Sequence, residues 1–283
     1  MLNESIVLEN AVSLERDLVK GVHTLHTTGG GHGSYAEMRF LTDTFYEMQR
    51  MRIALDNQIR SLETSGEPHE ILTWASRQSG LLEKQVERSL GAYSNATLPG
   101  RWMQNIKGIG PVLSSNFLSH LDITRTETAG GFWRFAGLDP SIKWNKGEKR
   151  PFNAKLKTAC WKAGDSFVKL KNHADSFYSQ VYVDRKELET ARNERGEFSD
   201  QATAKLKNFK IGKTTEAWKH YSEGRLPPAH IDHRARRYAV KLFLAHLHYV
   251  MYVDHYGKEP PKPYAIEHGG HAHMIMPPNY PVL

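Results

Sequence analysis

The stretch NIKGIGPVLSSNFLSHLDI, residues 105–123, places two glycines one residue apart directly before an apolar helical pattern. Gly108 and Gly110 can take positive φ, and neither carries a Cβ that would keep another group away from the backbone. Pro111 suits the first position of a helix, where a missing N–H costs little. The stretch therefore predicts two short helices, at about 100–105 and 111–121, joined by a tight turn.

A turn of this form is typical of a helix-hairpin-helix unit, which binds a phosphate. Its free backbone N–H groups point outward together, and the helix dipole favours an anion at the same place. Lys107 would add positive charge at the contact. Five apolar residues would hold the two helices together, namely Ile106, Ile109, Val112, Phe117 and Leu121. A tight turn between packed helices, with no ligand, remains the alternative.

The bulk composition favours an anionic partner. The chain has 283 residues, a formal net charge of +7 and a pI of about 9.3, as expected of a protein that binds nucleic acid or an anionic membrane surface. The single cysteine, Cys160, excludes an internal disulfide and a zinc site built from several cysteines. No apolar run reaches the roughly 18 residues that a membrane helix needs, and the first residues do not resemble a secretion signal. These features predict a soluble, cytoplasmic protein.

Two long amphipathic helices are predicted before the hairpin. Residues 35–63 carry an apolar stripe with a seven-residue repeat, and a second helix follows the break at 65–68. The stripe of the first helix comprises Leu41, Phe45, Met48, Met51, Leu55, Ile59 and Leu62. Two such helices joined by a short turn predict an antiparallel coiled-coil arm. The stripe would be buried against the partner helix or against another subunit, and we expect the arm to form a homo-oligomer, in the simplest case a dimer.

Positive charge is concentrated after the hairpin. Residues 141–171 contain nine lysines and arginines but only two acidic residues, Glu148 and Asp165. The basic residues are Lys143, Lys146, Lys149, Arg150, Lys155, Lys157, Lys162, Lys169 and Lys171. This local excess equals the excess of the whole chain, so the charge is gathered in one segment.

The rest of the chain is also helical in pattern. A charged stretch at 182–222, split near Gly196, predicts a solvated helical excursion, and residues 230–255 predict a last long helix. Alternation typical of strands is nearly absent, so the predicted fold class is mainly α. The predicted division is an N-terminal segment at 1–34, the arm at 35–99, a hairpin-containing domain at 100–256 with a charged insertion at about 175–228, and a tail rich in proline and histidine at 257–283 that forms an extended strap.

The order of these elements resembles a known family. The hairpin is followed by FWRFAGLDPS at 132–141, RPFNAKLKTACWKAG at 150–164 and RARRYAVKLFLAHL at 234–247. This order resembles the C-terminal domain of the insertion-sequence transposases with a DEDD nuclease domain, a group that includes the Piv invertase and the RNA-guided bridge recombinases. The arm resembles their coiled-coil linker. The resemblance covers about residues 40–255, apart from the charged excursion, and implies a helical nucleic-acid-binding domain related to transposases and recombinases.

Two features of that family are not found at their expected places. The family's N-terminal nuclease domain is rich in strands and supplies acidic metal ligands, whereas a short helical and glycine-rich segment precedes the arm here. The family also has a nucleophilic serine soon after the Gly-Leu-x-Pro stretch, where Lys146 aligns, and Ser141 lies several residues too early. We therefore expect the chain to lack the nuclease domain, and to keep the fold and the nucleic-acid contact without the family's strand transfer.

The candidate nucleic-acid contacts extend beyond the turn. The hairpin supplies Lys107, Gly108, Ile109 and Gly110, the basic segment would line a groove, and a late arginine cluster would add a second contact. The residues outside the turn are Lys143, Trp144, Lys146, Lys149, Arg150, Lys155, Lys157, Arg234, Arg236 and Arg237. The solvated side of an amphipathic helix is the alternative for the arginines.

Three tryptophans are interleaved with the basic segment. An aromatic side chain beside lysines can stack on unpaired bases, and Trp144 is the candidate for that role. Trp133 and Trp161 fit the core of a small domain at least as well.

The histidines suggest a metal site as an alternative. His268, His271 and His273 lie close together in the tail and have the chemistry to bind zinc. No predicted helix or strand fixes their geometry, so we interpret them as surface residues and expect no cofactor. His246 and His248 are two residues apart on a predicted helix, so they face different sides and are expected to be packing or capping residues.

Three functions remain open on the sequence alone. The first is a DNA- or RNA-binding protein, with DNA expected, that is related to transposases and has no catalytic activity of its own. The second is an active transposase or site-specific recombinase that works with a partner nuclease. The third is a phage or plasmid assembly protein in which the domain binds protein. Motifs of other enzyme classes, such as a nucleophile elbow or a phosphate loop, are absent from the sequence.

Overall fold

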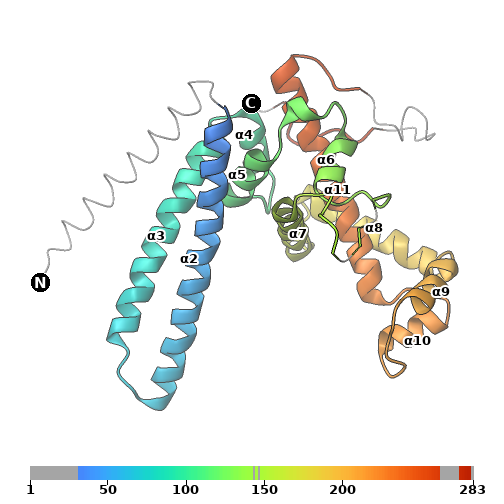
Figure 1. Cartoon of the computed structure of the whole chain (residues 1–283), viewed down its shortest axis with the longest axis horizontal. Helices are drawn as coiled ribbons and strands as arrows, with labels where there is room; N and C mark the ends of the chain where they lie inside the picture. Colours follow the sequence, from blue (N-terminus) through green and yellow to red (C-terminus); the bar gives the residue numbers. More distant parts are fainter. Residues whose placement is uncertain (1–30, 143, 146, 262–273, 282–283) are drawn as a thin grey trace, which may run out of the picture.

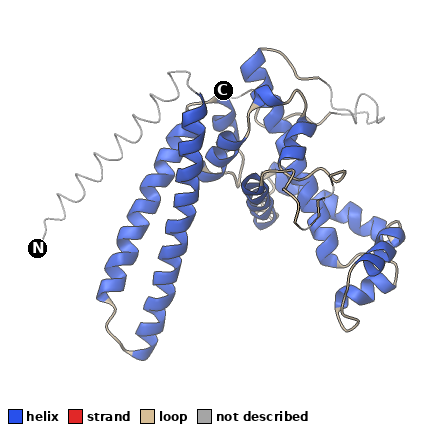
Figure 2. Ribbon diagram, viewed as in Figure 1, coloured by secondary structure: helices blue, strands red, loops and turns tan. Residues whose placement is uncertain are grey.

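The computed structural model describes residues 31–142, 144–145, 147–261 and 274–281. All regular structure in these ranges is helical (Figure 2), which confirms the predicted fold class. The α-helices are α2 (Gly31–Ser65), α3 (Glu70–Asn95), α4 (Leu98–Gln104), α5 (Pro111–His120), α6 (Ala129–Phe135), α7 (Ala154–Lys169), α8 (Phe177–Glu194), α9 (Ser199–Asn208), α10 (Glu216–Ser222) and α11 (Pro228–Tyr256), with a 3-10 turn at Ile123–Arg125. Within the same ranges, no helix has the length and apolar character needed to cross a membrane.

Helices α2 and α3 form the predicted antiparallel arm, which projects from the body of the molecule in Figure 1. The base of the arm is buried, because Phe45 of α2 and Leu90 of α3 belong to the main apolar core. Farther out, Met51 is 58% exposed, so the partner helix does not bury the predicted stripe at this position. Two helices alone cannot enclose every side of an apolar stripe, and in the described structure the body covers only the base of the arm.

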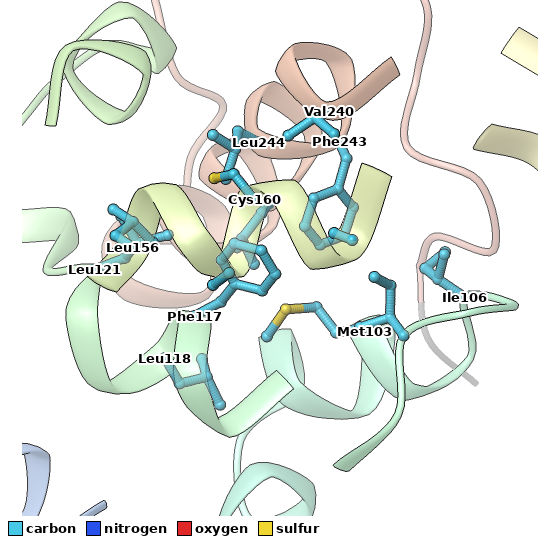
Figure 3. Packing of buried hydrophobic residues seen from close by; sticks show 14 of the residues in the cluster. Met103, Ile106, Phe117, Leu118, Leu121, Leu156, Cys160, Val240, Phe243 and Leu244 are labelled. Carbon is cyan, nitrogen blue, oxygen red and sulfur yellow. The ribbon is translucent and has the colours of Figure 1, made fainter. Parts of the chain in front are cut away.

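The body packs around α11. Trp102 of α4 stacks on Phe243 of α11 with ring centroids 5.9 Å apart, and Phe117 of α5 meets the same ring edge-on at 5.2 Å. Phe167 of α7 approaches Phe243 at 5.9 Å. Figure 3 shows Phe117 and Phe243 among the other apolar side chains that converge between α4, α5, α7 and α11. Full burial of each large side chain contributes about 1.5–3 kcal/mol, so this core fixes how the hairpin and α7 lie relative to each other.

Helices α8, α9 and α10 form a lobe at the far end of the molecule from the arm (Figure 1). Helix α8 packs along α11, and α9 packs with α10. Gly196, with φ of +77°, lies between α8 and α9, where the sequence predicted the split. The lobe has its own small apolar cluster, which consists of Phe198, Ala202, Tyr221, Leu226 and Ile231.

Residues 274–281 of the tail lie across the body. Nε1 of Trp102 in α4 donates a 2.8 Å hydrogen bond to the carbonyl of Pro278. Nε2 of His246 in α11 donates a 2.8 Å bond to the carbonyl of Ile275. This part of the tail is therefore an extended strap that joins α4 to α11.

Candidate nucleic-acid interface

The predicted turn joins α4 to α5, and its apolar residues are buried as expected. The N–H of Ile109 donates to the carbonyl of Ile106 at 3.0 Å, which closes the turn. Gly108 has φ of +92°, in the left-handed region that favours glycine. Ile106, Ile109, Val112, Phe117 and Leu121 are each at most 7% exposed. The hairpin therefore forms from the residues that the sequence indicated.

Gly108 faces the protein. A Cβ at this position would lie 2.6 Å from Oγ of Ser166 and 2.9 Å from Cδ1 of Leu170, both at the C-terminal end of α7. Oγ of Ser166 also donates a 2.8 Å hydrogen bond to the carbonyl of Gly108. The packing of the turn on α7 therefore requires glycine at position 108. This requirement does not depend on a ligand.

Gly110 faces open space. It is exposed, and nothing lies within 4 Å of the position that its Cβ would take. With φ of −91° and ψ of −176° it caps α5, and Pro111 follows at the start of the helix. In the described part of the chain, the N–H groups of Gly110, Val112 and Leu113 make no hydrogen bond. Unpaired N–H groups at a helix N-terminus form a place where an anion can bind.

Lys107 lies beside the turn and is exposed. Its ammonium pairs with the carboxylate of Asp175 in the connection between α7 and α8. The hydrogen bond from Lys107 lowers the pKa of Asp175. An exposed pair of this kind contributes at most about 1 kcal/mol, so a phosphate can replace Asp175 as the partner of Lys107.

The basic segment forms an exposed loop before α7. The guanidinium of Arg150 lies 5.3 Å from the ring centre of Trp144, and Lys149 is exposed beside it. Trp144 lies at the surface, and its Nε1 donates to the carbonyl of Glu148 at 2.8 Å. Lys143 and Lys146 lie outside the described residues.

Two lysines of α7 have different neighbours. Lys155 pairs with Asp43 of α2, which connects α7 to the arm. Nζ of Lys157 lies 4.4 Å from the ring centre of Phe152 and faces a cavity on the side of α11. The two predicted contacts therefore do not belong to one surface.

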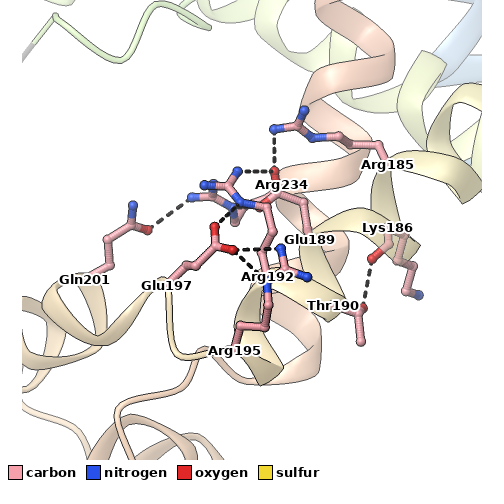
Figure 4. Close-up of polar contacts among 9 residues, drawn as sticks. All are labelled: Arg185, Lys186, Glu189, Thr190, Arg192, Arg195, Glu197, Gln201 and Arg234. Carbon is pink, nitrogen blue, oxygen red and sulfur yellow. Dashed lines mark hydrogen bonds and ion pairs between the residues drawn. The ribbon is translucent and has the colours of Figure 1, made fainter.

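The arginine cluster of α11 contains two residues that hold helices together. Nε of Arg234 donates to Glu189 of α8 at 2.7 Å (Figure 4). Arg236 lies between Asp165 of α7, at 3.6 Å, and Asp232, at 3.1 Å. These ion pairs bind α11 to α8 and α7, a structural role that the sequence did not indicate.

Arg237 is exposed and lines a cavity of about 200 Å³ between α7 and α11. Trp161 of α7 lines the same cavity and is 56% exposed, so the core position considered for it is wrong. Trp133 is half-buried and donates from Nε1 to the carbonyl of Lys241 at 2.9 Å. One lysine, two arginines and a histidine line the cavity, and no acidic residue does. The lining consists of Leu138, Lys157, Cys160, Trp161, His233, Arg236, Arg237 and Val240.

The hairpin turn and this cavity lie on opposite sides of α7. The turn contacts Ser166 and Leu170, whereas the cavity is lined by Lys157 and Trp161. Each pair of positions, 157 with 166 and 161 with 170, is nine residues apart, which at about 100° per residue is a rotation of half a turn. The predicted contacts therefore divide into two faces.

A larger hollow, of about 610 Å³, lies at the C-terminal end of α5. Three arginines line it, and each already bonds within the protein. Arg39 donates to a backbone carbonyl at 2.7 Å, Arg125 pairs with Asp122 at 3.2 Å, and Arg134 pairs with Asp139 at 4.0 Å. The three arginines of this hollow are therefore less available to a ligand than Arg237 is.

His246 and His248 of α11 have packing roles, as expected. Nδ1 of His246 accepts a 2.8 Å hydrogen bond from the hydroxyl of Tyr178, and burial lowers the pKa of His246 to about 4. His248 meets the ring of Phe132 edge-on at 5.1 Å. The candidate zinc ligands His268, His271 and His273 lie outside the described residues.

Ser141 and Cys160 have nucleophilic side chains, and neither is activated. The hydroxyl of Ser141 donates to Asp139 at 2.7 Å, and its hydrogen bonds lower the pKa of that carboxyl. A carboxylate with a lowered pKa is a weak proton acceptor, so Asp139 does not serve Ser141 as a general base. Burial raises the pKa of Cys160 to about 12, which keeps its thiol protonated.

Comparison with known proteins identifies one matching segment. Residues 100–179 match the model of the transposase IS116/IS110/IS902 family. The segment begins with α4, contains the hairpin, the basic segment and α7, and ends in α8. No curated protein and no solved structure matches the chain. The match confirms the resemblance to a C-terminal transposase domain over this segment.

Proposed function

We propose that this transposase-related chain is a nucleic-acid-binding module that grips the phosphate backbone of DNA through the hairpin turn and performs no strand transfer by itself. The observation that carries the proposal is the group of unpaired N–H donors at Gly110, Val112 and Leu113. All three lie at the start of α5, where Gly110 faces open space, inside the segment that matches the transposase family. A phosphate is the anion that such a group of donors suits best.

The charges around the turn support the same ligand. Lys107 is exposed beside the donors, and its pair with Asp175 is weak enough for a phosphate to replace it. Lys149 and Arg150 add exposed positive charge within the matched segment, but they precede α7, whereas the turn packs at the C-terminal end of that helix. Contacts of this type read the backbone and not the bases, so binding without sequence preference is expected from this face.

The environments of Ser141 and Cys160 support the proposal that the chain performs no strand transfer by itself. Ser141 lacks a proton acceptor in Asp139, and Cys160 is buried with a raised pKa. An activated nucleophile needs a base in reach or a lowered pKa of its own.

The arm supports self-association. Phe40 and Met51 are exposed eleven residues apart on one side of α2, and Trp74 and Leu81 are exposed seven residues apart on one side of α3. Stripes of apolar side chains on a helix pair are typical of a surface that packs against another copy. A dimer would present two hairpin turns to nucleic acid.

The proposal is tested by measuring how strongly labelled duplex DNA, single-stranded DNA and structured RNA bind across a salt series. Gly110→Glu puts a carboxylate where the phosphate would lie, and a negative charge at a helix N-terminus keeps α5 stable. Gly130→Glu is the matched control, because Gly130 is exposed on α6 and its Cβ position has only an ordinary contact at 3.7 Å.

We expect the affinity of the wild-type protein for duplex DNA to fall steeply with salt, and Gly110→Glu to weaken binding about ten-fold or more. Gly130→Glu should bind as the wild type does. Equal binding by Gly110→Glu and Gly130→Glu, with both proteins folded, would remove the hairpin from the interface.

A further inference from the structure

The cavity between α7 and α11 has the composition of a ligand site of its own. Helices α7 and α11 approach closely at Gly164, whose Cβ position lies 2.7 Å from Cγ of Arg236 and 3.0 Å from Cγ2 of Val240. The cavity lies one to two turns toward the N-terminus of α7, between Lys157, Trp161 and the start of α11. Its lining holds four basic residues and no carboxylate. We call this surface the α7–α11 groove.

The positive charge of the groove is only partly neutralised. Arg237 makes no ion pair with any described residue, and burial together with the charge of Arg234 lowers its pKa. Nε of Arg236 is buried and has no acceptor in the described part of the chain, although its Nη atoms meet Asp165 and Asp232. A buried donor without a partner is destabilising, and an anionic ligand would supply the missing acceptor.

An aromatic ring stands at the edge of this charge. Trp161 projects from α7 with 56% of its surface exposed, although it lines the same cavity as Arg237 and Lys157. Aromatic side chains beside cations are the usual platform on which unpaired bases stack. A duplex buries its base faces within the stack, so an exposed tryptophan favours a single strand.

The cations continue from the groove onto the lobe. Helix α9 packs on the start of α11, because Ile231 and Ala202 share an apolar cluster and Arg234 donates to Gln201 at 3.1 Å. Residues 201–215 contain four lysines and no acidic residue. Phe209 is exposed at the end of α9, with Nζ of Lys205 4.2 Å from its ring centre. Helix α9 thus carries exposed aromatic and basic side chains of the same kinds as the groove.

We propose that the α7–α11 groove and the adjoining lysines of α9 bind a single-stranded nucleic acid, with a base stacked on Trp161 and phosphates at Arg237 and Lys157. The site lies on the opposite side of α7 from the hairpin turn, so both can be occupied at once. The chain then holds an unpaired strand on one face and a duplex on the other. The inference extends the proposed function, but it does not depend on the hairpin being a phosphate site.

The test uses the full-length protein and a fluorescently labelled oligothymidine as the single strand. Trp161→Ala combined with Arg237→Ala removes the stacking ring and the free cation, both of which are exposed. Trp74→Ala is the matched control, since Trp74 is 63% exposed on the arm. Gly110→Glu alters the hairpin turn but not the groove, so it shows which of the two faces binds the single strand.

We expect the double variant to raise the dissociation constant for oligothymidine about ten-fold or more, while Trp74→Ala and Gly110→Glu change it less than about two-fold. An unlabelled duplex, added at a concentration that saturates the hairpin, should not displace the strand. If the double variant binds oligothymidine as tightly as the wild type does, the groove is not the site and the inference is overturned.

Two other outcomes separate the inference from the proposed function. Loss of both duplex and single-strand binding in Gly110→Glu would overturn the groove and support the hairpin. Unchanged duplex binding in Gly110→Glu, with single-strand binding lost only in the double variant, would support the groove and overturn the hairpin. Displacement of the strand by polyglutamate at an equal concentration of charge would show a site for acidic protein segments and would overturn the inference.

Discussion

The hydroxyl of Ser166 donates a 2.8 Å hydrogen bond to the carbonyl of Gly108, and the same hydroxyl oxygen lies 2.6 Å from the place a Cβ of Gly108 would take. The turn is therefore held on α7 by a contact that only glycine permits. Gly108→Ala should destabilise the protein by about 1–3 kcal/mol, because it adds a clash to a positive φ. Urea unfolding measures the difference.

Gly110→Ala is the control for this prediction. Its Cβ would meet nothing within 4 Å, and its φ of −91° suits any residue, so the free energy of unfolding should change by less than about 0.5 kcal/mol. Adding Ser166→Ala to Gly108→Ala should recover part of the loss. Similar stabilities for Gly108→Ala and Gly110→Ala would contradict the packing described for the turn.

The sequence predicted the helices and the hairpin well, because these depend on local patterns. Seven-residue and three- to four-residue apolar spacings identify helices without knowledge of their neighbours. The positive φ predicted for Gly108 is confirmed, but its cause is the close approach of α7 and not a ligand. That approach involves Ser166, 58 positions away, and leaves no local trace in the sequence.

The candidate site was harder to predict, because it depends on which side of a helix faces which neighbour. Trp161 and Cys160 are adjacent in sequence, but one is exposed and the other is buried. Arg234 and Arg237 are close in sequence, yet only Arg234 meets a carboxylate from α8. Composition indicates that cations are present, and only the fold determines which of them are already paired.

Glu189 is predicted to be a strong determinant of stability in α8. Its side chain is 1% exposed and meets Arg234 at 2.7 Å and also Arg185. Glu189→Gln would leave two half-buried cations without their counter-charge. We expect Glu189→Gln to lower the free energy of unfolding, measured in urea, by about 2–4 kcal/mol. Breaking a fully buried pair costs about 3–5 kcal/mol, and the loss here is at or below that because both arginines reach solvent. Glu216→Gln, which breaks only the exposed pair with Lys219, should cost less than about 1 kcal/mol, and an equal effect of the two variants would contradict this account.

His246 is predicted to make stability depend on pH. Burial lowers its pKa from the ordinary value of 6.5 to about 4, so the unfolded chain binds the proton more readily than the folded protein. The contribution of neutral His246 to the free energy of unfolding is complete above about pH 6.5 and is lost as the pH falls toward about 4. Near pH 5 the loss is about 2 kcal/mol. Urea unfolding near pH 7 and near pH 5 measures this, and His246→Gln should show a smaller difference. An unchanged difference in the variant would exclude His246 as the cause.

The arm is predicted to mediate self-association through its exposed apolar side chains. Trp74→Glu combined with Leu81→Glu places two charges on the exposed side of α3 and should convert a dimer into a monomer without unfolding the arm. Sedimentation velocity over a range of protein concentrations measures the change. A wild-type protein that stays monomeric at every concentration would contradict this role of the arm.

The most direct test of the hairpin as a phosphate site is an NMR titration of the labelled protein with a short duplex DNA. The amide signals of Gly110, Val112 and Leu113 should shift most strongly and gain protection from exchange, because their N–H groups acquire an acceptor. Gly130, exposed on α6, should not respond. Saturable duplex binding that leaves the three amides unchanged would contradict the central claim.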